Sequence, residues 1–166
     1  MIYIVVAALL VVLDQVVKFL VRTTMVLGDS MVLIPDVLGI TYVQNTGAAF
    51  SSFPNATMVL AGISLLVSLL LILAILLRWV RHPFGRFTLM LLLAGAVGNL
   101  IDRAVMGYVT DMVQVLFVKF AVFNLADVFV VTGAILLVLY VIFGWDRCER
   151  VHGKRERGKG KRSKKK

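Results

Sequence analysis

Cysteine and histidine are almost absent from this 166-residue chain, which contains one cysteine and two histidines. A single cysteine excludes a disulfide within the chain. We interpret Cys148 as an ordinary thiol that follows the last apolar stretch, with palmitoylation as the alternative. The two histidines, His82 and His152, leave little scope for chemistry that depends on imidazole groups.

Charge is also scarce, except at the C-terminal end. Eleven of the 18 Lys and Arg residues lie between Arg147 and Lys166, so the preceding chain is nearly neutral although the net charge is +9. Because this charge is confined to a tail, we expect no nucleic-acid partner. We expect residues 146–166 to be a disordered, solvated cytoplasmic tail that helps to set the topology. The alternative is binding to anionic lipid headgroups, at about 1 kcal/mol per basic residue.

Apolar residues are abundant, at 60% of the chain, whereas soluble domains have roughly 45–50%. The mean hydropathy is +0.95. Four apolar stretches, at about 2–22, 58–77, 87–104 and 125–144, approach the length of a membrane span, because 20 residues at about 1.5 Å each give roughly 30 Å. The sequence therefore predicts an all-α membrane protein, with a four-helix transmembrane domain at residues 1–145. The first stretch lacks the features of a cleaved signal peptide, so we expect it to be a span.

The distribution of basic residues predicts the orientation of the bundle. The loop 78–86 carries three arginines, whereas the segments 23–57 and 106–124 together contain a single basic residue, Lys119. By the positive-inside rule, loop 78–86 and both termini are expected in the cytoplasm. The segments 23–57 and 106–124 are then expected outside.

The two outer segments are too apolar to be simple loops. Residues 30–45, SMVLIPDVLGITYVQN, are rich in β-branched residues with a Pro-Asp turn signal, which predicts a small extracytoplasmic β-sheet lying on the membrane surface. In segment 106–124 the residues Phe117, Phe120 and Phe123 are three apart, which favours an interfacial helix turn.

Asp111 and Asp127 are the most informative residues of the sequence. They lie 16 positions apart, in the motifs YVTD and FNLAD, at the edges of apolar segments. An acid at the centre of a spanning helix costs about 2.5–3.5 kcal/mol, so such residues indicate function. Two carboxylates that meet can share a proton and activate water. The dipole of the fourth span favours Asp127 as the anion of such a pair.

Other polar residues are expected near the same outer surface. Asn99, Asp102 and Arg103 share one face of the third span by their spacing. The full set of polar groups predicted to converge there is Asp14, Lys18, Asn45, Asn99, Asp102, Arg103, Asn124 and Asp127.

Each of these groups also has a simpler interpretation. Asp14 and Lys18 have the i, i+4 spacing of an intrahelical ion pair. Asn124 and Asp127 have the spacing of a helix N-cap with an acid in the first turn. The dipole at a helix C-terminus disfavours Asp102 as an anion, so it needs a partner, for which Arg103 is the candidate although adjacent residues do not face each other.

Several other chemistries are excluded by these positions. Both histidines are predicted on the cytoplasmic side, away from the polar groups, which excludes a His-ligated metal and Ser-His or Cys-His catalysis there. No G-x-S-x-G motif is present. A hydrolase built on the outer groups would therefore depend on carboxylates, and we expect neither metal nor cofactor.

Five sequence blocks carry a resemblance to a known family. They are DQVVK at 14–18, QNTGAAFS at 44–51, GAVGNLIDR at 95–103, YVTDM at 108–112 and FNLADV at 123–128. In this order and register the chain resembles the lipoprotein signal peptidases (signal peptidase II), the aspartyl proteases of bacterial membranes. Any one block is weak evidence, but five in register are specific.

The resemblance implies removal of the signal peptide from a prolipoprotein, just before a cysteine that carries diacylglycerol. It implies a multi-pass protein of the bacterial inner membrane, acting as a monomer on lipidated prolipoproteins and in contact with membrane lipids. The implied catalytic residues are Asp111 and Asp127. The implied supporting residues are Asn45, Asn99, Arg103 and Asn124 around the site, and Asp14, Lys18 and Asp102 as structural polar residues. Met112 and Val128 depart from the family's usual Phe and Ser, which affects only the expected substrate preference.

Two competing hypotheses come from other functional classes. A small proton- or ion-coupled transporter also uses carboxylates within spans, but it predicts polar residues near the midplane and a repeat. The sequence shows no repeat, and its polar residues gather toward one surface. A non-enzymatic assembly factor would use the Asp and Asn side chains as contacts between helices. Cleavage of a lipidated precursor would separate the peptidase from both.

Overall fold

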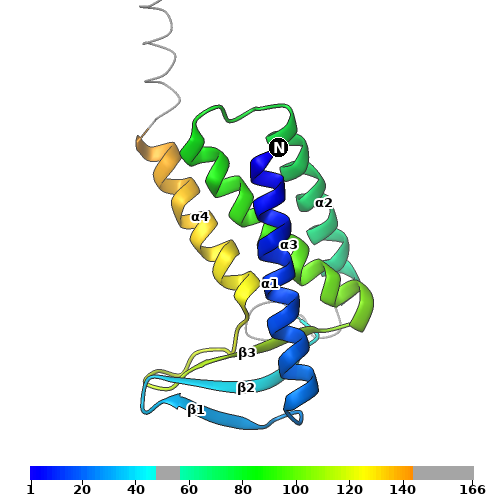
Figure 1. The fold of residues 1–166 in the computed structure, drawn as a ribbon, viewed down its shortest axis with the longest axis vertical. Coiled ribbons are helices and arrows are strands. Elements are labelled where there is room, and N and C mark those ends of the chain that lie inside the picture. The colour runs from blue at the N-terminus through cyan, green and yellow to red at the C-terminus, as the bar shows by residue number, and fades with distance from the viewer. Residues whose placement is uncertain (48–56, 144–166) are drawn as a thin grey trace, which may run out of the picture.

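The computed structural model describes residues 1–47 and 57–143, and within them the chain forms four helices and a three-stranded sheet. The order is α1 (Ile2–Thr24), β1 (Ser30–Ile34), β2 (Leu38–Asn45), α2 (Thr57–Leu76), α3 (Pro83–Met106), β3 (Val109–Val115) and α4 (Leu125–Phe143). Figure 1 shows the helices side by side, with the sheet across one end of the bundle. All four helices are long and apolar enough to cross a membrane. The predicted fold class is confirmed.

Helix α3 is the central element, because it packs against α1, α2 and α4 and has the largest buried share of the four helices. Small residues allow α4 to approach it closely. A Cβ atom on Gly95 would lie 2.4 Å from the carbonyl oxygen of Ala126, and one on Gly133 would lie 3.0 Å from the backbone nitrogen of Leu92. The close approach brings the first turn of α4 directly against α3.

The ends of α3 are set by local signals. His82 accepts a hydrogen bond at Nδ1 from the backbone N–H of Phe84 at 3.2 Å, and Pro83 occupies the first helical position. The helix therefore begins at 83, four residues before the predicted start at 87. At the other end Gly107 has φ +77°, the left-handed conformation that commonly follows a helix. This end lies beside the sheet (Figure 1).

The sheet is antiparallel in the order β1-β2-β3, and its third strand was not predicted. Residues 109–115 form β3, and the following residues 116–124 contain no helix, so the predicted interfacial helix turn at Phe117, Phe120 and Phe123 is wrong. Strand β3 forms because its backbone groups pair with β2, with Val43 opposite Asp111. Phe123 in turn forms an isolated bridge with Val113.

Two predictions concern residues outside the described ranges. The first is the basic cytoplasmic tail at 146–166, which contains Cys148 and His152. The second is the part of the QNTGAAFS block at residues 48–51.

Substitution of Gly95 by Ala is expected to destabilise the protein by about 1–3 kcal/mol, because the added methyl group overlaps the backbone of α4. Thermal unfolding in detergent measures the effect. The matched control is Gly62→Ala in α2, where an added Cβ meets nothing within 4 Å and should be neutral or stabilising. Equal melting temperatures for the two variants would contradict the proposed close contact.

Candidate active site

Asp111 lies in the middle of β3 and is 2% exposed. Each of its carboxylate oxygens accepts a hydrogen bond from a side-chain amide. Oδ1 accepts from Nδ2 of Asn124 at 2.6 Å, and Oδ2 accepts from Nδ2 of Asn45 at 3.0 Å. The carboxylate is therefore held between the start of α4 and the end of β2, and its orientation is defined on both sides.

Asp127 lies in the first turn of α4. Its Oδ1 accepts a hydrogen bond from Nδ2 of Asn99 at 2.7 Å, and its Oδ2 accepts from the backbone N–H of Asn124 at 3.2 Å. The Oδ1 atom of Asn124 accepts in return from the backbone N–H of Asp127 at 3.0 Å. This reciprocal pair is a capping box. The N-cap interpretation of Asn124 and Asp127 is confirmed, and the same Asn124 side chain also binds Asp111.

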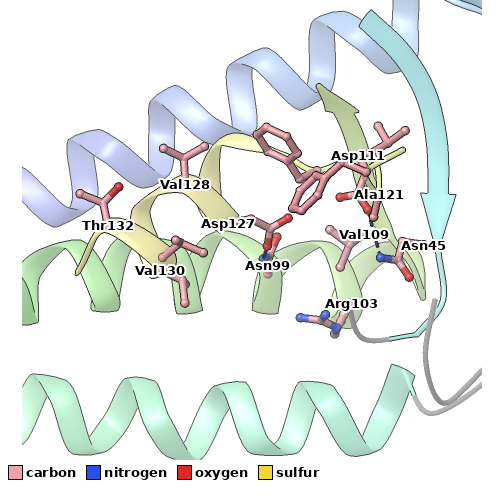
Figure 2. A pocket seen from close by; sticks show the side chains of 14 residues that line it. Asn45, Asn99, Arg103, Val109, Asp111, Ala121, Asp127, Val128, Val130 and Thr132 are labelled. Carbon is pink, nitrogen blue, oxygen red and sulfur yellow. Dashed lines mark hydrogen bonds between the residues drawn. The ribbon is translucent and has the colours of Figure 1, made fainter. Parts of the chain in front are cut away.

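Both carboxylates line one cavity of about 470 Å³ (Figure 2). Asn45, Asn99 and Arg103 line it beside them, so five of the six predicted site residues share this cavity, and Asn124 lies buried behind it. The remaining lining residues, mostly apolar, are Val109, Phe120, Ala121, Val122, Phe123, Val128, Val130, Val131 and Thr132. Figure 2 shows the polar groups gathered at one end, while Val128, Val130 and Thr132 extend away along α4.

Burial raises the pKa of Asp111 from its usual 3.8 to about 6. The hydrogen bond from Asn124 acts in the opposite direction, and the negative charge of Asp127 adds to the rise. A carboxyl group that keeps its proton to higher pH is suited to act as an acid near neutral pH. Asp127 lies at a helix N-terminus, where the dipole favours an anion.

Arg103 is the cation of the cavity. It lies in the last turn of α3, and its buried Nε atom has no hydrogen-bond partner among the described residues. The sequence suggested Arg103 as the partner of Asp102, but the structure pairs Asp102 with Lys18 instead. Adjacent residues on a helix point about 100° apart, so Arg103 faces the cavity while Asp102 faces α1 and contacts Lys18 at 3.2 Å.

The structural polar residues form a buried cluster between α1 and α3. The Lys18 ammonium lies 2.9 Å from Asp14, which confirms their intrahelical ion pair, but it also reaches Asp102 across the helix interface. Two further residues join this cluster that the sequence analysis missed. Gln15 donates to Oδ1 of Asp102 at 3.1 Å, and Arg22 donates to Oγ1 of Thr110 at 3.0 Å. Gln15, Lys18 and Arg22 are three and four positions apart, which places them on one face of the helix. This spacing could have predicted that they share a cluster.

The site thus offers acid–base groups, amide donors and one cation. No group of three or more His, Cys, Asp or Glu side chains that could hold a metal ion occurs in the described ranges. Two carboxylates that differ in environment can divide the roles of acid and base between them. Such an arrangement suits hydrolysis by an activated water molecule.

Comparisons with known proteins agree on one family. Residues 6–143 match the family described as signal peptidase (SPase) II. The lipoprotein signal peptidase of Enterococcus faecalis is 38% identical over 141 residues, covering 85% of this chain and 88% of that protein. The lipoprotein signal peptidase of Trichormus variabilis is 44% identical over 126 residues, covering 76% and 80%.

Two solved structures are also similar, both described as bacterial membrane enzymes. One has a TM-score of 0.79 and 32% sequence identity, and covers 84% of this chain and 87% of that chain. The other has a TM-score of 0.76 and 33% identity, and covers 84% and 91%. Similarity of this extent shows that the two enzymes share the fold of this chain over most of its length.

The pKa of Asp111 should increase further when a donor to its carboxylate is removed, because that hydrogen bond favours the anion. We expect Asn45→Ala to move the midpoint of Asp111, followed by carboxyl ¹³C NMR, from about 6 to higher pH. Gln44→Ala is the control, since Gln44 is the neighbouring amide of β2 and donates to Tyr42. A lower or unchanged midpoint in Asn45→Ala would show that Asn45 does not stabilise the anion.

Proposed function

The chain belongs to the signal peptidase II family, and on this premise we propose that it is an aspartyl endopeptidase that uses Asp111 and Asp127 to remove the signal peptide of diacylglyceryl-modified prolipoproteins. The family supports a multi-pass bacterial membrane protease that processes prolipoproteins. The observation that carries the finer proposal is the shared cavity, in which both carboxylates are held by amide donors at the polar end of an apolar groove.

The proposed orientation puts this cavity at the extracytoplasmic face. The N-terminus, the loop between α2 and α3 and the end of α4 lie at the end of the bundle opposite the sheet (Figure 1). That loop contains Arg78 and Arg81, and the basic tail follows α4. The positive-inside rule favours the cytoplasm for this end. The sheet, β3 and the two carboxylates would then face the opposite side.

In the proposed mechanism the two acids have different protonation states. Asp127 is the anion, supported by its place in the first turn of α4 and by hydrogen bonds from Asn99 and Asn124. Asp111 carries the shared proton, supported by its raised pKa. A water molecule between them loses a proton to Asp127 and attacks the scissile carbonyl carbon, while Asp111 donates its proton to the carbonyl oxygen. When the tetrahedral intermediate collapses, the C–N bond breaks, Asp127 returns its proton to the leaving amine nitrogen, and a hydroxyl proton of the intermediate returns to Asp111 as the carboxylic acid forms.

Arg103 is suited to bind the substrate backbone. Its buried Nε is a donor without a partner among the described residues, and its side chain lines the cavity. A substrate carbonyl oxygen would satisfy this donor, and an unsatisfied buried donor otherwise costs about 1–3 kcal/mol. Arg103 would thereby hold the chain next to the two carboxylates.

The apolar part of the cavity is suited to the lipid and signal-peptide portions of the substrate. It extends along α4, where Val131 is exposed on the outer surface of the bundle. A diacylglyceryl cysteine is held at the membrane surface by its acyl chains, so the bond next to it reaches the enzyme at headgroup depth. A groove that joins the apolar bundle surface to the carboxylates fits such a substrate.

Asp111→Asn and Asp127→Asn should each reduce cleavage by about 10²–10⁴-fold or more, because each removes one half of the acid–base pair. Release of the signal peptide from a purified lipidated precursor measures this. The matched control is Asp36→Asn, an exposed turn residue with φ 59°, a conformation that Asn tolerates well. Cleavage at the wild-type rate by either active-site variant would refute the pair.

A diacylglyceryl-modified precursor and its unlipidated twin should be cleaved at very different rates. The physical reason is that the acyl chains provide the apolar contact that holds the scissile bond near the carboxylates. Incubation of the purified protein with each peptide, followed by mass spectrometry of the products, tests this directly. Equal cleavage of both would contradict lipid-dependent recognition, and cleavage of neither would contradict the peptidase.

A further inference from the structure

Lys18 is fully buried at the interface of α1 and α3, and it is not among the described residues that line the cavity. Its ammonium group has three partners. They are Asp14 at 2.9 Å, Asp102 at 3.2 Å and the Oδ1 atom of Asn99 at 3.0 Å. An ammonium group has three N–H donors. Two of them face the carboxylates, and the third is directed to Asn99, which lines the active-site cavity.

The third contact continues to Asp127. Asn99 accepts from Lys18 at Oδ1 and donates from Nδ2 to Oδ1 of Asp127 at 2.7 Å. An amide side chain has an acceptor on one side and a donor on the other. A cation at the oxygen therefore determines that the N–H group faces Asp127, and it polarises that N–H group as a donor. Lys18 acts on the anion of the pair without touching it.

The two carboxylates bound by Lys18 also hold the backbone beside each catalytic acid. Asp14 accepts at Oδ1 from the backbone N–H of Ala126, at 2.9 Å, and Ala126 directly precedes Asp127. Asp102 accepts at Oδ2 from the backbone N–H of Thr110, at 2.9 Å, and Thr110 directly precedes Asp111. One ammonium group thus links the start of α4 to strand β3.

We propose that Lys18 is a positioning residue for the carboxylate pair, which orients Asn99 as the donor to Asp127 and, through Asp14 and Asp102, holds the backbones of both acids. This inference rests on the proposed function and adds a residue to it. The charged groups on the elements around the pair are Asp14, Lys18 and Arg22 on α1, Asp102 and Arg103 on α3, Asp111 on β3 and Asp127 on α4.

Loss of the ammonium group should move the alkaline limb of the pH–rate profile, which reports loss of the proton from Asp111. Burial is the main cause of the raised pKa of Asp111, and the charge of Lys18 acts in the opposite direction. Its removal therefore moves this limb to higher pH. A role confined to stability would change the amount of active protein and leave the limb in place.

The test is the pH dependence of kcat/KM for Lys18→Gln on a diacylglyceryl-modified precursor peptide in detergent micelles. We expect the alkaline limb to move to higher pH, by up to about one pH unit. We also expect kcat to fall about 10-fold or more and KM to stay within about twofold, because Lys18 does not reach the cavity. An unchanged alkaline limb would overturn the proposal.

Arg22→Gln is the matched control. It removes a positive charge from the same cluster, where Arg22 lies 3.7 Å from Asp102, but Arg22 donates to Thr110 and not to Asn99. We expect a loss of thermal stability with a smaller fall in kcat than in Lys18→Gln. An equal fall in kcat in this control would show a general effect of charge and overturn the role of Asn99.

The relay itself is tested in an Asn99→Ala background. There, Lys18→Gln should cause little further fall in kcat, because the connecting amide is gone. A further fall in kcat as large as in the wild-type background would overturn the relay.

A second variant covers the case in which Lys18→Gln does not fold. Lys18→Met combined with Asp14→Asn removes both charges of the intrahelical pair and keeps a side-chain oxygen for Ala126. It should show the same fall in kcat, because the contact with Asn99 is lost in both variants, and a wild-type kcat would contradict the proposal.

The failure of this inference can be distinguished from failure of the proposed function. If the wild type cleaves no lipidated precursor, the proposed function fails. The inference about Lys18 is still tested by the pH midpoint of the Asp111 carboxyl ¹³C signal in the substrate-free protein. This midpoint should be higher in Lys18→Gln than in the wild type. An unchanged midpoint would contradict the inference.

Discussion

Two carboxylates and one ammonium group are buried together between α1 and α3, and the positions of Asp111 and Asp127 depend on this cluster. Removing such groups from water is costly unless each is paired and hydrogen-bonded. Here Asp14 and Asp102 meet this requirement partly through backbone N–H groups of α4 and β3. The need to satisfy buried charge therefore brings together four elements, α1, α3, β3 and α4, and it places Asp127 and Asp111 next to these contacts.

One side chain, Asn124, caps helix α4 and also binds Asp111. Asn124 accepts the N–H of Asp127 as a helix cap, and its amide nitrogen donates to Asp111. A cap stabilises α4 by about 1 kcal/mol, and in this place it also sets the direction of both carboxylates. Asn124 makes both contacts at once because its side chain has an acceptor and a donor on different atoms.

Much of the fold and the site could be predicted because the relevant signals are local. Continuous apolar stretches predicted four spans, and β-branched residues with a Pro-Asp turn predicted β1 and β2. Asp111 and Asp127 were identified because acids are rare in apolar segments, and the expected topology placed the asparagines near them before the family blocks supported the same residues. The segment 106–124 was misjudged because the periodicity of its phenylalanines was taken for a helix, whereas pairing with β2 decided its conformation.

By itself, the sequence determined that the chain has four membrane-spanning segments, belongs to its family and carries two unusual acids. Only the tertiary structure decided which groups meet. Lys18 contacts Asn99 across 81 positions of the chain, and Ala126 contacts Asp14 across 112. Asp102 faces Lys18 and not its neighbour Arg103 for the same reason. Hydropathy and motifs describe each segment separately, whereas these contacts depend on how closely and at which rotation the helices pack.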